Sequence, residues 1–414
     1  MFSRIAPSGT QTARTAIRIA ALLLTCTHAI AQTPATPPSP RSNPVEANAT
    51  SKLAKQADPD SAVGRLLQHA DNQAFPCGLA NGWDNQCLRT RYQGKPEQWP
   101  RPVIDQGKSW EEWSAVPAVA VATDPREKSM LDLGTALYFD PGLSRKGGVS
   151  CASCHQSNKS FGDGLALSVG EDKLMGRRRA QTLFAAPFVD QLFWDGRAPS
   201  LEAQAKDSIR NPFEMNNTLD AALKHVNAQV HYRELAKKSL GREVINEDEM
   251  VAAIAHFVRT IRPPTSVADQ VIEGNTEVLT DQQLLGLNLF RTKARCMNCH
   301  HGALMTDNEF HDLGLSFYGR RNQDLGRFEA TRNKQDLGKF RTPSLRGVSH
   351  AGPWMHNGLF ANMPGLIRLY NTGMGVVTGD PAKDSYVPAK SAHIQSLNLN
   401  AEEIDALIEW LKLL

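Results

Sequence analysis

From about residue 125 onward, hydrophobic residues recur at spacings of three and four, which is typical of helices that bury one face. No long stretch alternates apolar and polar residues in the way that a half-buried strand does. Residues 129–139 and 281–292 are predicted to be helices, and each precedes a CxxCH motif. The pattern therefore predicts an all-α fold.

Three further helix starts are marked by capping boxes, in which two side chains three positions apart each accept the other's backbone N–H. The boxes are Asn246 with Glu249, Thr280 with Gln283 and Asn400 with Glu403. The first of these helices is expected to stop at Pro263-Pro264, because proline cannot continue the helical hydrogen bonds. The stretch 342–360 is rich in Pro and Gly and is expected to be an ordered loop.

The N-terminus has the pattern of an export signal. It shows the basic residues Arg4, Arg14 and Arg18, the apolar stretch Ile19 to Leu24, and the small-residue cleavage pattern Ala29-Ile30-Ala31. The apolar stretch is too short to span a bilayer, and no later segment is apolar enough to do so. Residues 1–31 are therefore expected to be removed from a periplasmic protein. Lipidation at Cys26 is the alternative, but Thr25 fits that signal poorly.

Composition indicates how many domains the chain can form and argues against nucleic acid as a partner. The chain has 414 residues, 41% of them hydrophobic, which is enough for two or three small domains. Its net charge of +3 gives no reason to expect nucleic-acid binding, and Arg177-Arg178-Arg179 is expected to be a solvated loop. Residues 32–59 are expected to be a disordered linker. Residues 60–116, which carry four tryptophans, are expected to be an N-terminal extension packed on the main body.

The seven cysteines fall into three groups. One lies in the export signal, four lie in the two CxxCH motifs, and Cys77 and Cys87 are left over. In an oxidising compartment this leftover pair is expected to form a disulfide, with two free buried thiols as the alternative.

The motifs CASCH (151–155) and CMNCH (296–300) are typical of c-type haem attachment. In such a motif two thiols form thioethers with the haem, and the histidine that follows ligates the iron. Zinc would need four clustered ligands, whereas each motif offers two thiolates and one histidine. We therefore expect two covalent haems c, one in each half of the chain. The attachment residues are Cys151, Cys154 and His155 for haem 1, and Cys296, Cys299 and His300 for haem 2.

Longer segments around the motifs carry a resemblance to a known family. They are LGTALYFDPGLSRKGGVSCASCH (133–155), QLFWDGRAPSLEAQAKDSI (191–209), FEMN (213–216) and FRTPSLRGVSHAGPWMHNG (340–358). From about residue 117 to its end, the chain resembles the bacterial di-haem cytochrome c peroxidase/MauG family. The resemblance implies two cytochrome c-like domains, a peroxidatic one at 117–265 and an electron-transfer one at 275–414, with the active site near their interface.

The resemblance also implies roles for three residues in the first domain. Trp194 matches the tryptophan between the haems, Glu214 the distal acid, and Gln204 the distal glutamine. Splitting the O–O bond of a peroxide needs a group that takes a proton from one oxygen and delivers one to the other. A carboxylate in a dry pocket can do this, so Glu214 is the expected proton carrier.

Two positions depart from the peroxidase branch of the family. Glu171 lies sixteen positions after His155, where peroxidases that need reductive activation carry a histidine that blocks the first iron. Haem 1 is therefore expected to be open without prior reduction. Tyr370 lies fourteen positions after His356, where the peroxidase branch has Met and the MauG branch has Tyr. Tyr370 is the expected distal ligand of haem 2, with Met374 as the alternative.

The calcium site that the family has between its domains is also altered. Arg179 replaces an asparagine, and Ala351 and Pro353 occupy the two main-chain positions. A fixed guanidinium is expected to take the place of the cation and to point at those carbonyls. Calcium is therefore expected to bind weakly or not at all.

Three functions follow from the resemblance, and all three stay open at this point. The first is a periplasmic peroxidase that reduces hydrogen peroxide with electrons from a small cytochrome c or copper protein, and dimers are common in that branch. The second is a MauG-type enzyme that takes its electrons from residues of a partner protein, which Glu171 and Tyr370 favour. The third is a non-enzymatic di-haem electron carrier, which the distal acid and the open iron disfavour.

Overall fold

The computed structural model describes residues 77–119 and 122–414. The described residues belong to one compact unit. The predicted export signal and linker lie outside the described residues. Within the described residues, no helix has both the length and the apolar character needed to cross a bilayer.

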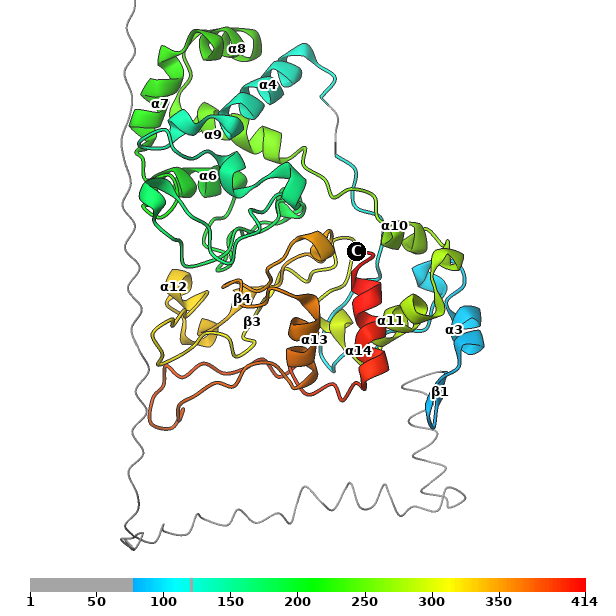
Figure 1. Ribbon diagram of the computed structural model, residues 1–414. Coiled ribbons are helices and arrows are strands. Elements are labelled where there is room, and N and C mark those ends of the chain that lie inside the picture. Colours follow the sequence, from blue (N-terminus) through cyan, green and yellow to red (C-terminus); the bar gives the residue numbers. More distant parts are fainter. Residues whose placement is uncertain (1–76, 120–121) are drawn as a thin grey trace, which may run out of the picture. The chain divides into compact units, whose positions relative to one another are not determined.

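The described residues are mostly helical, as the hydrophobic spacing predicted (Figure 1). The helices are α3 (Asn85–Arg91), α4 (Pro125–Phe139), α5 (Cys151–Cys154), α6 (Leu201–Arg210), α7 (Leu219–Ala228), α8 (Val230–Leu240), α9 (Glu247–Val258), α10 (Val267–Ile272), α11 (Asp281–Arg291), α12 (Phe328–Thr331), α13 (Met363–Asn371) and α14 (Ala401–Leu411). The strands form two short antiparallel pairs, β1 (Gly78–Leu79) with β2 (Gly82–Trp83) and β3 (Phe310–His311) with β4 (Phe340–Arg341).

All three predicted capping boxes are confirmed, at the starts of α9, α11 and α14. The predicted end of α9 at Pro263-Pro264 is too late, because the helix ends at Val258. Its last turn tightens into i→i+3 hydrogen bonds, from the N–H of Thr260 to Phe257 and from that of Ile261 to Val258. The chain therefore leaves the helix before the prolines are reached.

The two halves repeat one helical plan. In the first half α4 packs against α8 and α9, and in the second half α11 packs against α14 (Figure 1). Each crossing is close because a glycine lies in it. A Cβ on Gly134 of α4 would collide with the carbonyl of Ala253, and a Cβ on Gly286 of α11 would collide with the carbonyl of Ala406. In each half the helix with this glycine precedes the CxxCH motif.

The described part of the N-terminal extension belongs to the core of the second half. A disulfide joins Cys77 to Cys87, the residues that flank β1, β2 and the start of α3. Helix α3 packs on α11, and the hydroxyl of Tyr92 donates to the side chain of Asn288 over 3.0 Å. Trp99 and Trp113 are buried in the same hydrophobic cluster as α11 and α14.

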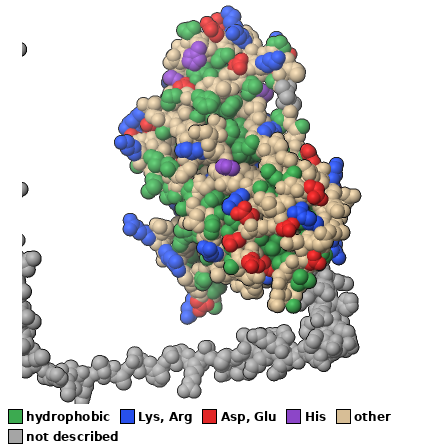
Figure 2. Space-filling model, turned by 45° about the vertical axis from the view of Figure 1, so that its right-hand side comes forward, with side chains coloured by type: hydrophobic (Ala, Val, Ile, Leu, Met, Phe, Trp, Pro, Cys, Tyr) green, Lys and Arg blue, Asp and Glu red, His purple; other side chains and the backbone are tan. Residues whose placement is uncertain are grey.

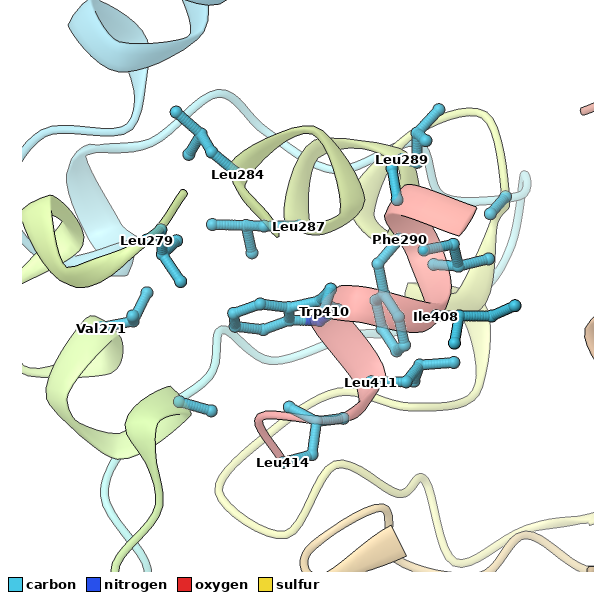
Figure 3. Packing of buried hydrophobic residues seen from close by; sticks show 14 of the residues in the cluster. Val271, Leu279, Leu284, Leu287, Leu289, Phe290, Ile408, Trp410, Leu411 and Leu414 are labelled. Atoms are coloured by element: carbon cyan, nitrogen blue, oxygen red, sulfur yellow. The ribbon is translucent and has the colours of Figure 1, made fainter. Parts of the chain in front are cut away.

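The core of the second half is centred on α11 and α14. Figure 3 shows Trp410 with Leu287 and Phe290 beside it, and all three side chains are at most 1% exposed. Burying a side chain of this kind contributes roughly 1.5–3 kcal/mol relative to leaving it in water. This packing anchors α11, the helix that precedes the second CxxCH motif, to α14.

The predicted solvated loop at Arg177-Arg178-Arg179 is wrong for Arg178 and Arg179, whereas Arg177 is exposed. The guanidinium of Arg178 binds Asp195 of the first half (2.6 Å) and Asp324 of the second (2.7 Å), and its side chain is 14% exposed. The sequence favours a solvated loop for these three arginines because burying a charge is costly unless the charge is paired. Its partners come from segments far along the chain, so local composition could not reveal them. The surface seen in Figure 2 also bears interspersed acidic and basic side chains over much of its lower part.

Candidate active site

A single cavity of about 740 Å³ is lined by residues of both halves of the structure. Both CxxCH motifs contribute to its wall, with Cys151, Cys154, His155, Cys296, Cys299 and His300. Trp194, Gln204, Glu214 and Tyr370, which the resemblance singled out, line the same cavity. The fold therefore brings these predicted site residues, separated by more than two hundred positions, to one place.

The two motif histidines are held in the same way. Nδ1 of His155 lies 2.9 Å from the carbonyl of Phe161, and Nδ1 of His300 lies 3.0 Å from the carbonyl of Met305. Burial lowers the pKa of both imidazoles, which favours the neutral ring. A neutral ring that donates from Nδ1 keeps Nε2 as its coordinating atom. Both histidines thus fit the role of an axial haem ligand.

The cysteine sulfurs do not form a zinc site in the described part of the chain. The sulfur of Cys299 lies within 4.8 Å of ligand atoms of Asp307 and His311. However, Nε2 of His311 lies 2.9 Å from the Asp307 carboxylate, which also accepts from Lys108 over 3.3 Å. That group is an ion-pair network beside the second motif. Burial raises the pKa of each of the four thiols to about 12, as expected for protonated sulfurs in an apolar wall.

Helix α6 and the turn after it position the two predicted distal residues. Ser200 caps the helix through the N–H of Ala203, and the amide of Gln204 donates to the Ser208 hydroxyl over 2.9 Å. Asn211 caps the other end, and its amide donates to a carboxylate oxygen of Glu214 over 2.7 Å. A short capped helix followed by a hydrogen-bonded turn thus holds Gln204 and Glu214 in the wall that they share with His155.

Glu171 does not face the cavity in the described structure. Its carboxylate accepts from the N–H groups of Lys146 and Gly148, both over 3.3 Å. A hydrogen bond from the Ser144 hydroxyl, with these backbone bonds, lowers the pKa of Glu171 below its ordinary value. Its own N–H donates to the carbonyl of Glu214 over 2.7 Å. Glu171 therefore supports the segment that carries Glu214, the predicted distal acid.

Trp194 lies where the two halves meet and is 6% exposed. Its indole N–H donates to the carbonyl of Arg179 in the first half over 3.0 Å. Its own carbonyl accepts from the N–H of Arg341 in the second half over 2.8 Å. These two hydrogen bonds fix the indole in the cavity wall between the two motifs.

Arg179 makes one of the two contacts that the sequence predicted for it. Its guanidinium donates to the carbonyl of Ala351, whereas no described hydrogen bond joins it to Pro353. Burial lowers the pKa of Arg179 to about 10. A guanidinium thus occupies the neighbourhood of the family's calcium position, and the donor set there does not fit a bound cation, because Arg179 is itself positive.

The structure distinguishes the two candidate ligands of haem 2. Tyr370, near the end of α13, lines the cavity, and burial together with the nearby Cys299 and Cys296 raises the pKa of its hydroxyl. Met374 is 4% exposed and, in the described structure, is absent from the cavity wall. Met374 has a backbone φ of +65°, and its N–H donates to the carbonyl of Leu369. The placement favours Tyr370, and ligation itself stays a prediction.

His356 is a cavity residue to which the sequence analysis gave no role. Its ring stacks on Phe340 at 3.6 Å, and the guanidinium of Arg178 lies 5.5 Å from the same Phe340 ring. Its Nε2 is buried without a hydrogen-bond partner among the described residues, and burial lowers its pKa to about 3. An internal repeat could have revealed it, because His356-Asn357-Gly358 follows the second motif as Trp194-Asp195-Gly196 follows the first.

Comparison with known proteins points to one family over both halves. Residues 128–277 match the family model described as di-haem cytochrome c peroxidase. The cytochrome c551 peroxidase of Nitrosomonas europaea is 35% identical over 238 residues, which is 57% of this chain and 71% of that protein. The methylamine utilization protein MauG of Methylorubrum extorquens is 35% identical over 297 residues, 71% of this chain and 77% of that protein.

A solved structure agrees with the sequence comparisons. The crystal structure of a MauG-like protein associated with microbial copper homeostasis is similar with a TM-score of 0.63 and 27% identity. The similarity covers 75% of this chain and 95% of that one. Proteins named as peroxidases and proteins named as MauG thus share the fold and sequence pattern in which the cavity is built.

Proposed function

The chain belongs to the family of di-haem cytochrome c peroxidases and MauG proteins, and from that premise we propose that it is an exported di-haem peroxidase. It reduces hydrogen peroxide to two waters, consuming two electrons and two protons. One observation carries the proposal: a single cavity joins His155 with Glu214 and Gln204, and the position of the blocking histidine holds Glu171, which points elsewhere. A cavity closed by a second histidine would not admit the oxidant.

The haems supply the iron that accepts oxidising equivalents from peroxide. The thiols of the two motifs would hold them as haems c, with His155 and His300 as iron ligands. Tyr370 would be a further ligand of the second iron and would lower its reduction potential relative to a methionine ligand. Trp194, fixed between Arg179 and Arg341, provides the aromatic bridge along which electrons pass between the two sites.

Glu214 is the group that moves protons in this proposal. Its carboxylate takes a proton from one oxygen of the peroxide and delivers it to the other oxygen, which leaves as water. The amide of Asn211 holds that carboxylate in one orientation. Gln204, held by Ser208, positions the peroxide for the transfer. The largely apolar wall keeps bulk water from competing for the proton.

A second function has its own support. The MauG-type reaction takes its electrons from residues of a partner protein instead of from a small cytochrome c or copper protein. The tyrosine in the cavity at position 370 and the absence of a histidine at position 171 favour this reaction. The two reactions use the same oxidised enzyme and differ in where its electrons come from.

One rapid-mixing experiment tests the proposal. The di-haem protein is mixed with hydrogen peroxide, with and without a reduced small cytochrome c, and the haem spectra are followed. Fast oxidation of the cytochrome supports the peroxidase. A long-lived oxidised state that the cytochrome does not discharge supports the MauG-type reaction. A haem spectrum that peroxide leaves unchanged would leave only an electron carrier.

A further inference from the structure

Two tryptophans from opposite ends of the described chain stack in the core of the second half. Trp113 belongs to the N-terminal extension and Trp410 to α14. Their ring centroids are 5.6 Å apart, their planes differ by 18°, and both side chains are 0% exposed. Figure 3 shows Trp410 at the centre of this core. Stacked indoles share a positive charge more readily than a single indole does, because their π-systems overlap.

The pair is in contact with the predicted ligand of haem 2. The indole N–H of Trp113 donates to the carbonyl of His300 over 3.1 Å. Phe290 lies 5.3 Å from the Trp113 ring and 6.5 Å from the His300 ring, between centroids. Electron transfer through protein weakens steeply with distance. The hydrogen bond from Trp113 to His300, with the Phe290 ring between their side chains, provides a short path for an electron between the pair and the predicted haem 2 ligand.

An ion pair lies beside the Trp113 end of the pair. The guanidinium of Arg291 lies 5.6 Å from the Trp113 ring, where it opposes a positive charge. Glu112 binds that guanidinium through two hydrogen bonds, of 2.6 and 2.8 Å, and its carboxylate also accepts from the backbone N–H of Trp113 over 2.9 Å. No cation lies over the Trp410 ring among the described residues. The ion pair therefore leaves little net charge beside the two rings to oppose a positive charge that they share.

We propose that Trp113 and Trp410 form a third redox site, which gives one electron to the haem 2 site after peroxide has oxidised the enzyme. The inference rests on the proposed function, since hydrogen peroxide is the oxidant. Peroxide takes two electrons to become two waters. When no donor is present, one of the resulting oxidising equivalents moves to the pair, which loses one electron and becomes a tryptophan radical cation.

The proton balance of this step is simple because no proton has to move. The N–H of Trp113 faces a backbone carbonyl, which is too weak a base to remove it. The N–H of Trp410 is buried without an acceptor among the described residues. Both indoles therefore keep their protons, no bond is made or broken, and the electron can return by the same route when a donor arrives.

The test uses the complete di-haem enzyme, mixed with hydrogen peroxide without donor and freeze-quenched for electron paramagnetic resonance. An organic radical signal is expected, and its lines should narrow when ring-deuterated tryptophan is incorporated into the unaltered enzyme. Trp410→Phe should lose most of the signal and lengthen the life of the oxidised haem spectrum. Trp113→Phe should lower the yield. Trp99→Phe, in the same core but outside the stacked pair, should retain it.

The outcomes separate this inference from the proposed function. If the haem spectrum does not respond to peroxide, the proposed function fails. If the haems respond but the radical persists unchanged in Trp410→Phe, the inference is overturned. Should Trp410→Phe fail to take up haem, Trp113→Phe and the deuterated enzyme decide together, because a signal that does not narrow, or that Trp113→Phe leaves unchanged, does not come from the pair.

Discussion

Trp194 and His356 occupy equivalent positions in the two halves and meet edge to face, with ring centroids 6.3 Å apart. The carbonyl of Trp194 accepts from the N–H of Arg341 over 2.8 Å, and the carbonyl of His356 accepts from the N–H of Arg179 over 2.8 Å. Each ring thus sits in a loop bound to the opposite half. The reciprocal bonds give the contact between the two halves a pseudo-symmetric arrangement around these two rings.

Replacing the distal acid gives the most direct test of the chemistry. Glu214→Gln keeps the shape of the side chain and can still contact Asn211, but it cannot carry a proton. The rate of reaction with peroxide should fall by about 10²–10⁴-fold, the range that general acid–base groups contribute. Stopped-flow absorbance measures this rate. The resting haem spectra should be unchanged, because Glu214 is not predicted to ligate iron.

Glu234→Gln provides the matched control, since Glu234 lies on α8 and not in the cavity wall. It should react with peroxide at the unaltered rate. If Glu214→Gln also reacted at that rate, another group would have to move the proton, and the assignment of Glu214 would be wrong.

Two substitutions decide the distal ligand of haem 2. Tyr370→Met should raise the reduction potential of that haem, because methionine stabilises reduced iron relative to tyrosinate. Met374→Leu should leave the potential unchanged, since Met374 packs away from the cavity. Spectroelectrochemical titration of both variants provides the comparison. A potential that moves only in Met374→Leu would assign the ligand to Met374 instead.

The pH dependence of stability should report on Glu171. Hydrogen bonds lower its pKa in the folded protein below the ordinary value of 4.5. Its stabilising contribution is therefore complete above that pH and is lost as the pH falls through the lower, folded pKa. Glu171→Gln should lower stability near neutral pH by roughly 1–3 kcal/mol and flatten the acid limb of the curve. Denaturant unfolding of the haem-loaded protein at several pH values measures both.

Sequence alone predicted the features of the site that depend on residues close together in the chain. The CxxCH spacing, the capping boxes and the long motifs each depend on neighbours a few positions apart. The resemblance of the long motifs to the family singled out Gln204 and Glu214, and the packed helices bring both into one cavity wall with His155. The closeness of α4 to α9 also follows from a local feature, the glycine at position 134.

Sequence alone could not predict the contacts between residues that lie far apart in the chain. The guanidinium of Arg178 is buried because Asp324 arrives from 146 positions away, and no composition rule anticipates that. The stacking of Trp113 on Trp410 depends on an extension that returns to the far end of the chain. Glu171 could be recognised as a missing histidine, but its bond to Glu214 required coordinates.

Arg179 should make the enzyme independent of calcium. Its guanidinium donates to Ala351, its N–H to His356, and its carbonyl accepts from Trp194. Prolonged treatment with a chelator should leave the haem spectra and the peroxide reaction of the unaltered enzyme unchanged. Arg179→Asn removes the positive charge and supplies an amide oxygen, so this variant should lose inter-haem electron transfer in chelator and regain it when calcium is added.

Arg177→Asn is the control, because Arg177 is half exposed and pairs only with Glu329 and the carbonyl of Gln323 among the described residues. Exposed ion pairs contribute about 0–1 kcal/mol, so this variant should behave like the unaltered enzyme with or without calcium. Calcium content measured by atomic emission gives an independent readout. Stoichiometric calcium that survives the chelator in the unaltered enzyme would show that the guanidinium does not replace the cation, and that Arg179 only braces Trp194.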